Sequence, residues 1–278
     1  MKVSFKTAPM HTDWTAVRDV WVEADDMDVF AGGWTFDHFM PIRGDASGPC
    51  LEGWVLLSAL ASITSRLRLG VMVTGNTHRH PAVLANMAAT LDVISDGRLD
   101  LGIGAGWNAD EHEAYGIELP GLKERFDRFD EAIEVIHLLL TEDTADFDGD
   151  HYRLQSARCE PKPVQQPRPP LVIGGGGEKR TLRTAARWAD HWNTPGMDFD
   201  LESFRHKAGV LAAWCESVDR KFDDIEKSIQ FWSGDPASLP ERLAQAEEAG
   251  VDHSVVALAS PHRVADLVAV AEAVRASR

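Results

Sequence analysis

Cysteine and long apolar runs are both scarce in this sequence of 278 residues. Its three cysteines, Cys50, Cys159 and Cys215, lie far apart and form no CxxC pair, which argues against a disulfide framework and a cysteine-based zinc site. No stretch approaches the roughly 18 uninterrupted apolar residues of a membrane-spanning helix, and MKVSFKTAP lacks the apolar core of a secretory signal. We therefore expect a cytoplasmic protein with no membrane partner.

Basic residues are outnumbered by acidic ones. The 28 lysines and arginines against 44 aspartates and glutamates give a formal net charge of −16. Such a charge opposes loose attraction to nucleic acid or to an anionic membrane surface. An anionic ligand would need backbone amides and a few local cations to hold it against this field.

The order of apolar and amphipathic segments predicts the fold class. Eight short apolar runs indicate buried strands: Val3 to Thr7, Gly33 to Asp37, Arg68 to Thr74, Leu99 to Gly104, Leu171 to Gly174, His191 to Thr194, Ser228 to Trp232 and Ser254 to Leu258. Eight segments with helical spacing follow them: Trp14 to Asp28, Gly53 to Thr64, Pro81 to Ser95, Leu122 to Leu140, Lys179 to Ala189, Leu201 to Val218, Leu239 to Ala249 and Pro261 to Ala276. Strict alternation requires parallel strands joined by crossover helices. We predict an α/β fold, a single-domain (β/α)8 TIM barrel spanning residues 1–278.

Two strands and two connections in this scheme are unusual. The second and sixth strands contain Gly33 and Asn193, which are poor strand formers. The connections Ala105 to Gly121 and Thr141 to Pro170 are longer than most loops in a compact domain. The second holds HYRL and PKPVQQPRPP, which predict a short hairpin and an extended return segment, an insertion region before strand five.

Polar residues after the second and third strands are the first candidates for chemistry, because barrel enzymes place catalytic groups at the carboxyl ends of strands. In WTFDHF, Asp37 could orient His38 for proton transfer, and a structural histidine is an equal alternative. After the third strand, His78 and His80 form an HxH pair of the kind that binds metals. In metal-dependent barrel hydrolases that pair ends the first strand, so we expect no metal.

Two glycine-rich segments follow the fourth and fifth strands. LGIGAGWNADEHEAYG places Trp107 and Asn108 after glycines that allow a flat ring to approach, although a flexible loop is the alternative. In LVIGGGGEKR, four glycines precede a helix and expose amides suited to a phosphate. Lys179, Arg180 and Arg183 are unusual at a helix start unless an anion lies nearby, and a tight turn with solvated charges is the alternative. Arg125 could assist the phosphate or form an ordinary surface ion pair.

Taken together, WTFDHF, LGVMVTGNTHRHPAVLANMAATLDVISDGRLDLGIGAGWNADEHEAYG, RFDRFDEAIEVIHLLL and LVIGGGGEKRTL resemble the luciferase-like monooxygenase superfamily, in its F420-dependent oxidoreductase branch. The likeness runs from the first strand to about Asn193. It implies the barrel fold, a non-prolyl cis peptide between Met72 and Val73, and His38 near the reactive face of a deazaflavin. The residues that we expect at the cofactor are Asp37, Met72, Val73, Thr74, Trp107, Asn108, Arg125, Gly174, Gly175, Gly176, Gly177, Glu178 and Trp192.

The sequence departs from the family pattern where the first helix ends, at Asp28 and Val29, and where the second strand begins, at Gly32 and Gly33. No set of basic residues points to a sugar-phosphate substrate.

We therefore predict an enzyme that passes a hydride between coenzyme F420 and a small organic substrate, with His38 as the catalytic residue. The nearest alternative is a monooxygenase that uses reduced FMN on the same fold. A metal-dependent barrel hydrolase and a cofactor-binding protein without catalysis are further alternatives. Resemblance also implies a homodimer.

Overall fold

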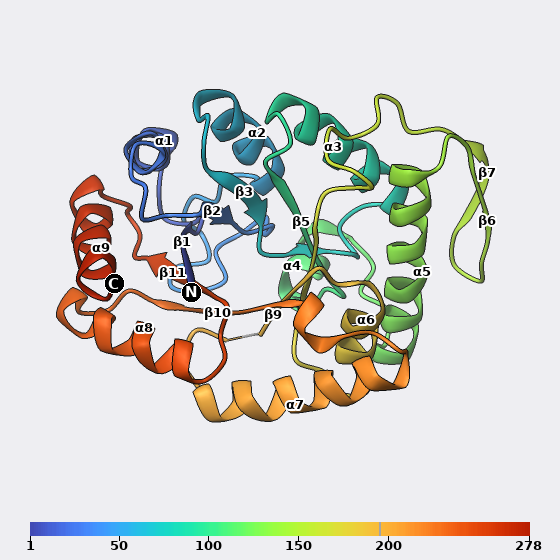
Figure 1. Cartoon of the computed structure of the whole chain (residues 1–278). Coiled ribbons are helices and arrows are strands. Elements are labelled where there is room, and N and C mark those ends of the chain that lie inside the picture. Colours follow the sequence, from blue (N-terminus) through green and yellow to red (C-terminus); the bar gives the residue numbers. More distant parts are fainter. Residues whose placement is uncertain (195) are drawn as a thin grey trace.

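The computed structural model describes residues 1–194 and 196–278, in which eight parallel strand positions close into a barrel surrounded by helices (Figure 1). The strands are β1 (Lys2–Thr7), β2 (Gly32–Thr35), β3 (Arg68–Val71), β5 (Leu99–Gly104), β8 (Leu171–Gly174), β9 (His191–Asn193), β10 (Glu226–Trp232) and β11 (His253–Leu258). The short strand β4 (Thr74–Gly75) continues β3, and pairing of β11 with β1 and of β3 with β5 closes the sheet. The predicted (β/α)8 barrel is confirmed.

The eight predicted helices are also confirmed, with small changes in their bounds. They are α1 (Trp14–Asp25), α2 (Gly53–Ile63), α3 (Pro81–Ile94), α5 (Leu122–Thr141), α6 (Thr181–Trp188), α7 (Leu201–Ser217), α8 (Leu239–Glu248) and α9 (Val264–Ala276). Short 3₁₀ turns, η1 (Phe222–Asp224) and η2 (Pro236–Ser238), precede β10 and α8. One face of α5 is apolar and buried through Phe129, Ile133, Ile136 and Leu140.

The strands alternate between an apolar outer face and a polar inner face. On β1, Phe5 packs edge-on against the rings of Trp21 and Phe30, with centroids 5.3 and 5.4 Å away, and so belongs to the layer under the helices. Ser4 and Lys6, one position to either side, are buried as well, on the opposite face of the strand. Gly33 is tolerated in β2 because a Cβ there would lie 2.7 Å from the rings of Phe5 and Trp21.

Both long connections contain secondary structure. The segment from Ala105 to Gly121 holds a helix that we did not predict, α4 (Ala109–Tyr115), whose polar sequence nevertheless has Glu111 and His112 buried. The segment before β8 forms the predicted hairpin, in which β6 (Ala145–Asp148) pairs with β7 (Arg153–Ala157) in antiparallel fashion. The hairpin stands outside α5 at the edge of the molecule (Figure 1).

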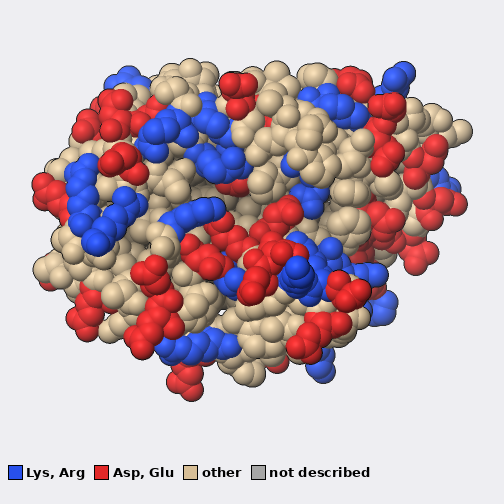
Figure 2. Space-filling view, in the orientation of Figure 1, with Lys and Arg blue, Asp and Glu red and all other residues tan. Residues whose placement is uncertain are grey.

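The surface carries charges of both signs. Figure 2 shows acidic and basic side chains interspersed over the face in view, without a wide area of basic charge. In the described residues, no helix combines the length and the apolar character that crossing a membrane requires.

Contact between β3 and β5 gives a test of the barrel. A Cβ on Gly102 would lie 2.0 Å from the carbonyl oxygen of Val71, so Gly102→Ala must separate the two strands. We expect this substitution to lower the free energy of unfolding by roughly 1–3 kcal/mol, measured by urea titration. Gly209, in the interior of α7, has open space around its Cβ position, so Gly209→Ala should raise stability by up to about 1 kcal/mol. Equal effects of the two substitutions would contradict this packing.

Candidate active site

A cavity of about 490 Å³ opens at the carboxyl ends of the barrel strands. Nine of the residues expected at the site belong to its lining: Asp37, His38, Met72, Val73, Thr74, Trp107, Asn108, Gly174 and Gly175. They follow four different strands, β2, β3, β5 and β8, which the parallel barrel brings to one end. The structure therefore brings the predicted segments together, while their roles stay predictions.

The bulge between β3 and β4 contains the predicted cis peptide bond between Met72 and Val73, which is confirmed. Val73 lines the cavity, and glycines surround its side chain. A Cβ on Gly174 would lie 2.7 Å from Val73 Cγ2, and one on Gly104 would lie 3.0 Å from the same atom. The glycines of both predicted motifs thus make room for the bulge, and Val73 forms an apolar shelf in the cavity wall.

His38 is held by a carboxylate that sequence reasoning did not select. Its Nδ1 lies 2.8 Å from Oε2 of Glu111, whose side chain is fully buried on α4. The other carboxylate oxygen of Glu111 accepts a hydrogen bond from the N–H of Phe39. The His38 ring contacts Phe36 and Trp107 edge-on, with centroids 4.9 and 5.7 Å away. Since Nδ1 is engaged with Glu111, Nε2 is the nitrogen available to a molecule in the cavity.

The electrostatics keep Glu111 ionised. Burial alone would raise its pKa, but the hydrogen bonds from His38 and from the Phe39 N–H, together with the charges of His38 and His78, lower the pKa below its ordinary value. A carboxylate that stays negative accepts a hydrogen bond from His38 Nδ1 and so fixes the proton on that nitrogen. The arrangement suits a histidine that donates or accepts a proton at Nε2.

Asp37 has a different environment from the one that we predicted. Its carboxylate is fully buried and accepts a 3.0 Å hydrogen bond from Arg79, and His78 Nδ1 lies 3.4 Å away. Burial would raise the pKa of Asp37, but His78 and Arg79 lower it. His78 in turn lies 3.8 Å from Glu111. Asp37 therefore holds His78, which in turn lies beside Glu111, and the charge of Asp37 is already balanced by Arg79.

The glycine turn after β8 leads into α6 as predicted. Gly175 has a φ of +129°, which favours glycine. Its N–H donates to the Asn193 carbonyl, and the Leu182 N–H donates to the Gly177 carbonyl, both at 3.0 Å. The backbone amides between Gly175 and Leu182 lie at the start of α6, and the start of a helix favours a bound anion. Thr181, the first residue of α6, adds a hydroxyl to the cavity lining.

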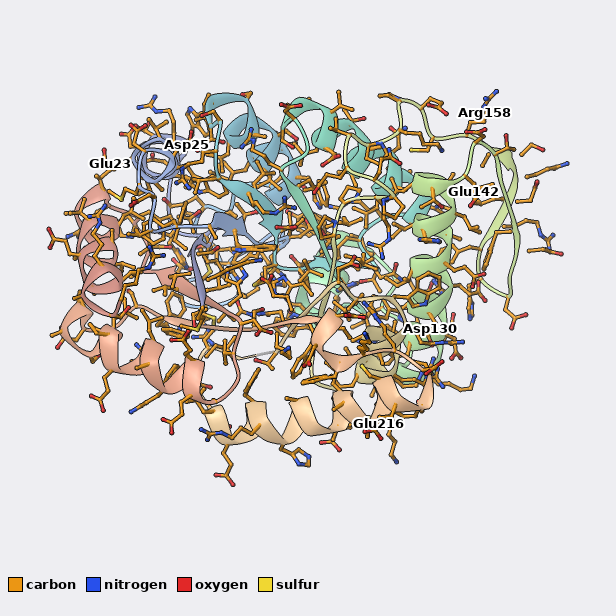
Figure 3. The ribbon with its side chains drawn as sticks, viewed as in Figure 1. Glu23, Asp25, Asp130, Glu142, Arg158 and Glu216 are labelled. Atoms are coloured by element: carbon orange, nitrogen blue, oxygen red, sulfur yellow. The ribbon has the colours of Figure 1, made fainter. Side chains whose placement is uncertain are left out.

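Our interpretation of the cations at this helix start was wrong for Arg180 and Arg183. Arg180 binds Asp127 at 2.7 Å and Asp130 at 2.9 Å, and Arg183 binds Asp130 at 3.1 Å. Figure 3 labels Asp130 on α5, beside α6. The anion that accounts for these arginines is thus a pair of side chains from the neighbouring helix.

Five predicted cofactor residues are not among the lining residues: Arg125, Gly176, Gly177, Glu178 and Trp192. Trp192 points outward, where it stacks on Phe204 and donates to the Gly175 carbonyl at 2.8 Å, so it supports the glycine turn from the far side. Glu178 pairs with His206 and Lys207 of α7. Arg125 donates to the Gly106 carbonyl at 3.0 Å and so fixes the loop after β5.

The cavity lining also includes polar side chains from β1, β9 and β10 that we did not predict. Lys6 donates to the Met72 carbonyl at 3.1 Å and to Gln230 Oε1 at 2.7 Å. Burial lowers the pKa of Lys6 to about 8. Asn193 lies beside Gln230, whose amide donates to Asn193 Oδ1 at 3.2 Å.

Two groups of side chains in the described residues have metal-ligating atoms within 4.8 Å of one another. The first group consists of His78, Glu111 and His112. Both ring nitrogens of His112 already have partners, because Nδ1 lies 2.6 Å from the Asn108 carbonyl oxygen and Nε2 lies 2.7 Å from Thr77 Oγ1. The second group, His191, Glu226 and His253, consists of the first residues of β9, β10 and β11. It therefore lies at the amino-terminal end of the barrel, away from the cavity.

A family model described as luciferase-like monooxygenase matches residues 7–232, which include every strand end that lines the cavity up to β10. The chain belongs to the luciferase-like monooxygenase family. This agrees with the barrel, the bulge at Met72 and Val73, and the cavity at the strand ends.

Relatives within the luciferase-like family share about a third of the sequence. An uncharacterised protein of Mycobacterium tuberculosis is 33% identical over 232 residues, 81% of this chain and 77% of the relative. An F420-dependent glucose-6-phosphate dehydrogenase of Kineococcus radiotolerans is 33% identical over 251 residues, 89% of this chain and 71% of the relative.

Solved structures with low sequence identity share the luciferase-like fold over the whole chain. An F420-dependent secondary alcohol dehydrogenase, in complex with an F420-acetone adduct, superposes with a TM-score of 0.87 at 18% identity and covers 100% of this chain and 99% of its own. A riboflavin lyase with modified FMN and riboflavin superposes with a TM-score of 0.79 at 15% identity, covering 99% and 91%.

The buried ammonium of this luciferase-like protein gives a prediction on stability. The pKa of Lys6 is about 8 in the folded chain against an ordinary value of 10.5, so the unfolded chain binds more protons between these two pH values. Stability must therefore rise with pH across this window. Relative to Lys6→Met, the wild-type free energy of unfolding should rise by about 3 kcal/mol from pH 8 to pH 10.5, measured by urea titration. If the free energy of unfolding varied with pH in the same way for the wild type and Lys6→Met, this prediction would be contradicted.

Proposed function

We propose that this protein is an F420-dependent oxidoreductase that transfers a hydride between the deazaflavin and a small organic substrate. The observation that carries the proposal is the His38–Glu111 pair, a histidine fixed by a buried carboxylate and facing the cavity. This pair supplies a proton donor or acceptor at the place where the barrel fold positions reacting groups.

The lining fits a flat ring that carries a phosphate. The Val73 shelf gives an apolar surface for the ring, and Thr74 and Asn108 line the cavity beside it. Exposed Trp107, 63% accessible, could cover the ring from the mouth of the cavity. The phosphate would take the amides at the start of α6, with the Thr181 hydroxyl beside them.

These contacts give the cofactor and the side chains different roles in the proposed reaction. Bound F420 would supply the hydride donor or acceptor. His38 would hold or move the accompanying proton at Nε2, and Glu111 would keep the imidazole in the required tautomer. The aromatic side chains of Phe36 and Phe126 line the cavity, and Trp107 at its mouth would limit the access of water once the cofactor is bound.

The relatives support the cofactor more than they support a particular substrate. The Kineococcus relative is named an F420-dependent glucose-6-phosphate dehydrogenase. Among the described lining residues the cations are Lys6 and Arg43, and Arg43 lies over the Trp232 ring at 5.5 Å. A cavity with so few cations favours a substrate less charged than a sugar phosphate.

Binding measurements on the apoprotein test the proposal. F420 and FMN would be titrated separately, and the bound fraction followed by cofactor fluorescence. We expect saturable binding of one F420 per chain, at least tenfold tighter than binding of FMN, about 1.4 kcal/mol. Tighter binding of FMN would favour the reduced-FMN monooxygenase instead, and indifference to both cofactors would refute the proposal.

Removal of the imidazole tests the role of His38. We expect His38→Ala to lower the rate of hydride transfer by roughly 10²–10⁴-fold while F420 affinity stays within about tenfold. Stopped-flow absorbance of the deazaflavin measures the rate, and fluorescence titration measures the affinity. His151→Ala, which removes a histidine between β6 and β7 of the outer hairpin, is the matched control and should leave both unchanged. A wild-type rate in His38→Ala would remove His38 from the mechanism.

Neutralising the partner of His38 tests the pair. Glu111→Gln keeps the shape but removes the carboxylate that fixes the proton and the orientation of His38, so the rate of hydride transfer should fall in the wild type and should not fall further when the substitution is made in His38→Ala. Stopped-flow absorbance of the deazaflavin measures the rates, and Glu113→Gln on the same helix is the control. An equal loss in both backgrounds would show that Glu111 does not act through His38.

Other candidate functions have their own decisive measurements. Stoichiometric zinc or manganese in the purified protein would favour a metal-dependent hydrolase. Tight F420 binding without turnover over a broad panel of alcohols, aldehydes and enones would favour a binding protein. The homodimer implied by resemblance stays a prediction, and light scattering of the protein in solution would decide it.

A further inference from the structure

The floor of the cavity holds a buried lysine with an unusual environment. Lys6 is only 7% exposed, and in the described part of the chain it forms no ion pair. Its two acceptors, the Met72 carbonyl at 3.1 Å and Gln230 Oε1 at 2.7 Å, are both uncharged. Lysines are almost never buried in folded proteins unless a negative group pairs with them.

The hydrogen bonds around Lys6 leave part of its capacity unused. An ammonium group has three N–H donors, and the two acceptors occupy two of them. Lys6 belongs to the lining of the cavity, so the third donor is available to a molecule bound there. Two acceptors without charge do not offset the cost of burying the ammonium.

A chain of amides lies behind Lys6 and presents an acceptor to its ammonium group. Gln230 turns its oxygen toward Lys6 and donates through Nε2 to Asn193 Oδ1, at 3.2 Å. Asn193 then donates through Nδ2 to Ser228 Oγ, at 2.8 Å. The Gln230 oxygen therefore faces the ammonium and the Asn193 oxygen faces the Gln230 amide, so the chain supplies an aligned acceptor without a negative charge.

We propose that Lys6 forms an oxyanion subsite in the cavity floor, which binds one negatively charged oxygen of the ligand, either a carboxylate or a deprotonated imide-type oxygen. Three side chains from β1, β9 and β10 build the subsite: Lys6 binds the oxygen, Gln230 orients the ammonium, and Asn193 orients Gln230. The other lining cation, Arg43, is exposed and lies over Trp232, so it belongs to the rim. The subsite depends on the cavity alone and does not require the F420 chemistry.

A pair of ligands of equal shape tests the subsite. Benzoate and benzamide would be titrated into the apoprotein by calorimetry, because both fit an aromatic-lined cavity and only benzoate carries a charged oxygen. We expect wild type to bind benzoate at least tenfold more tightly than benzamide, and Lys6→Met to lose this preference. Arg43→Met is the matched control, which removes the other lining cation and should retain the preference. Circular dichroism and thermal unfolding would check that both variants are folded.

A measurement on the wild type alone covers the case in which Lys6→Met does not fold. Benzoate, and not benzamide, should shift the side-chain ammonium resonance of Lys6 in lysine-labelled protein. Absence of a preference for benzoate in the wild type, whether both ligands bind or neither does, overturns the proposal. A preference that persists in Lys6→Met, or one that is lost in Arg43→Met, overturns it as well.

Repeating the titration with saturating F420 distinguishes the source of the oxygen. Continued Lys6-dependent binding of benzoate would show that the subsite takes an oxygen of the substrate. Displacement of benzoate by F420, with weaker F420 binding in Lys6→Met, would assign it to the cofactor. Failure of F420 to bind would count against the proposed function alone, because the benzoate preference is measured without it.

Discussion

The buried carboxylate of Glu111 is the contact on which the candidate site depends. It joins the end of β2 to α4 by accepting from the Phe39 N–H and by holding His38 Nδ1 at 2.8 Å. A buried carboxylate is costly unless several donors satisfy it. His38, the Phe39 N–H, the nearby His78 and the amide of Asn108 at 3.5 Å together meet this requirement. The same contacts that keep Glu111 stable therefore orient His38 toward the cavity.

The barrel makes this arrangement possible by separating apolar and polar faces of its strands. Phe5, Trp192 and their neighbours pack outward under the helices, while Lys6, Asn193 and Gln230 face inward. The glycines at positions 102, 104 and 174 allow the strands and the Val73 side chain to approach closely. The result is a cavity with an apolar surface at Val73, an imidazole that can exchange a proton at His38, and a cationic group at Lys6.

The sequence predicted the barrel well because its signal is periodic and local. Alternating apolar runs and amphipathic segments located every barrel strand and its helix, and the motifs located the four strand ends around the cavity. The second strand is confirmed despite two glycines, because a Cβ on Gly33 would crowd Phe5 and Trp21 and a Cβ on Gly32 would lie 2.6 Å from the Arg68 carbonyl oxygen.

The parts that sequence reasoning missed depend on contacts between distant segments. Glu111 lies in a short polar helix, and nothing in its sequence shows that it meets His38, 73 positions away. Arg180 and Arg183 suggested a bound anion, but their partners are carboxylates on α5. Trp192 follows an inward-facing residue on a three-residue strand, so the alternation of side chains directs it away from the cavity. In each case the contact that decides the role of the side chain is made with a segment that the local sequence does not reveal.

A crystal structure of the protein grown with F420 would show directly whether the cavity at the strand ends holds the cofactor beside His38. We expect the deazaflavin ring against Val73, within reach of His38, with the phosphate at the amides that open α6. A ring bound elsewhere, or a phosphate far from the start of α6, would contradict it.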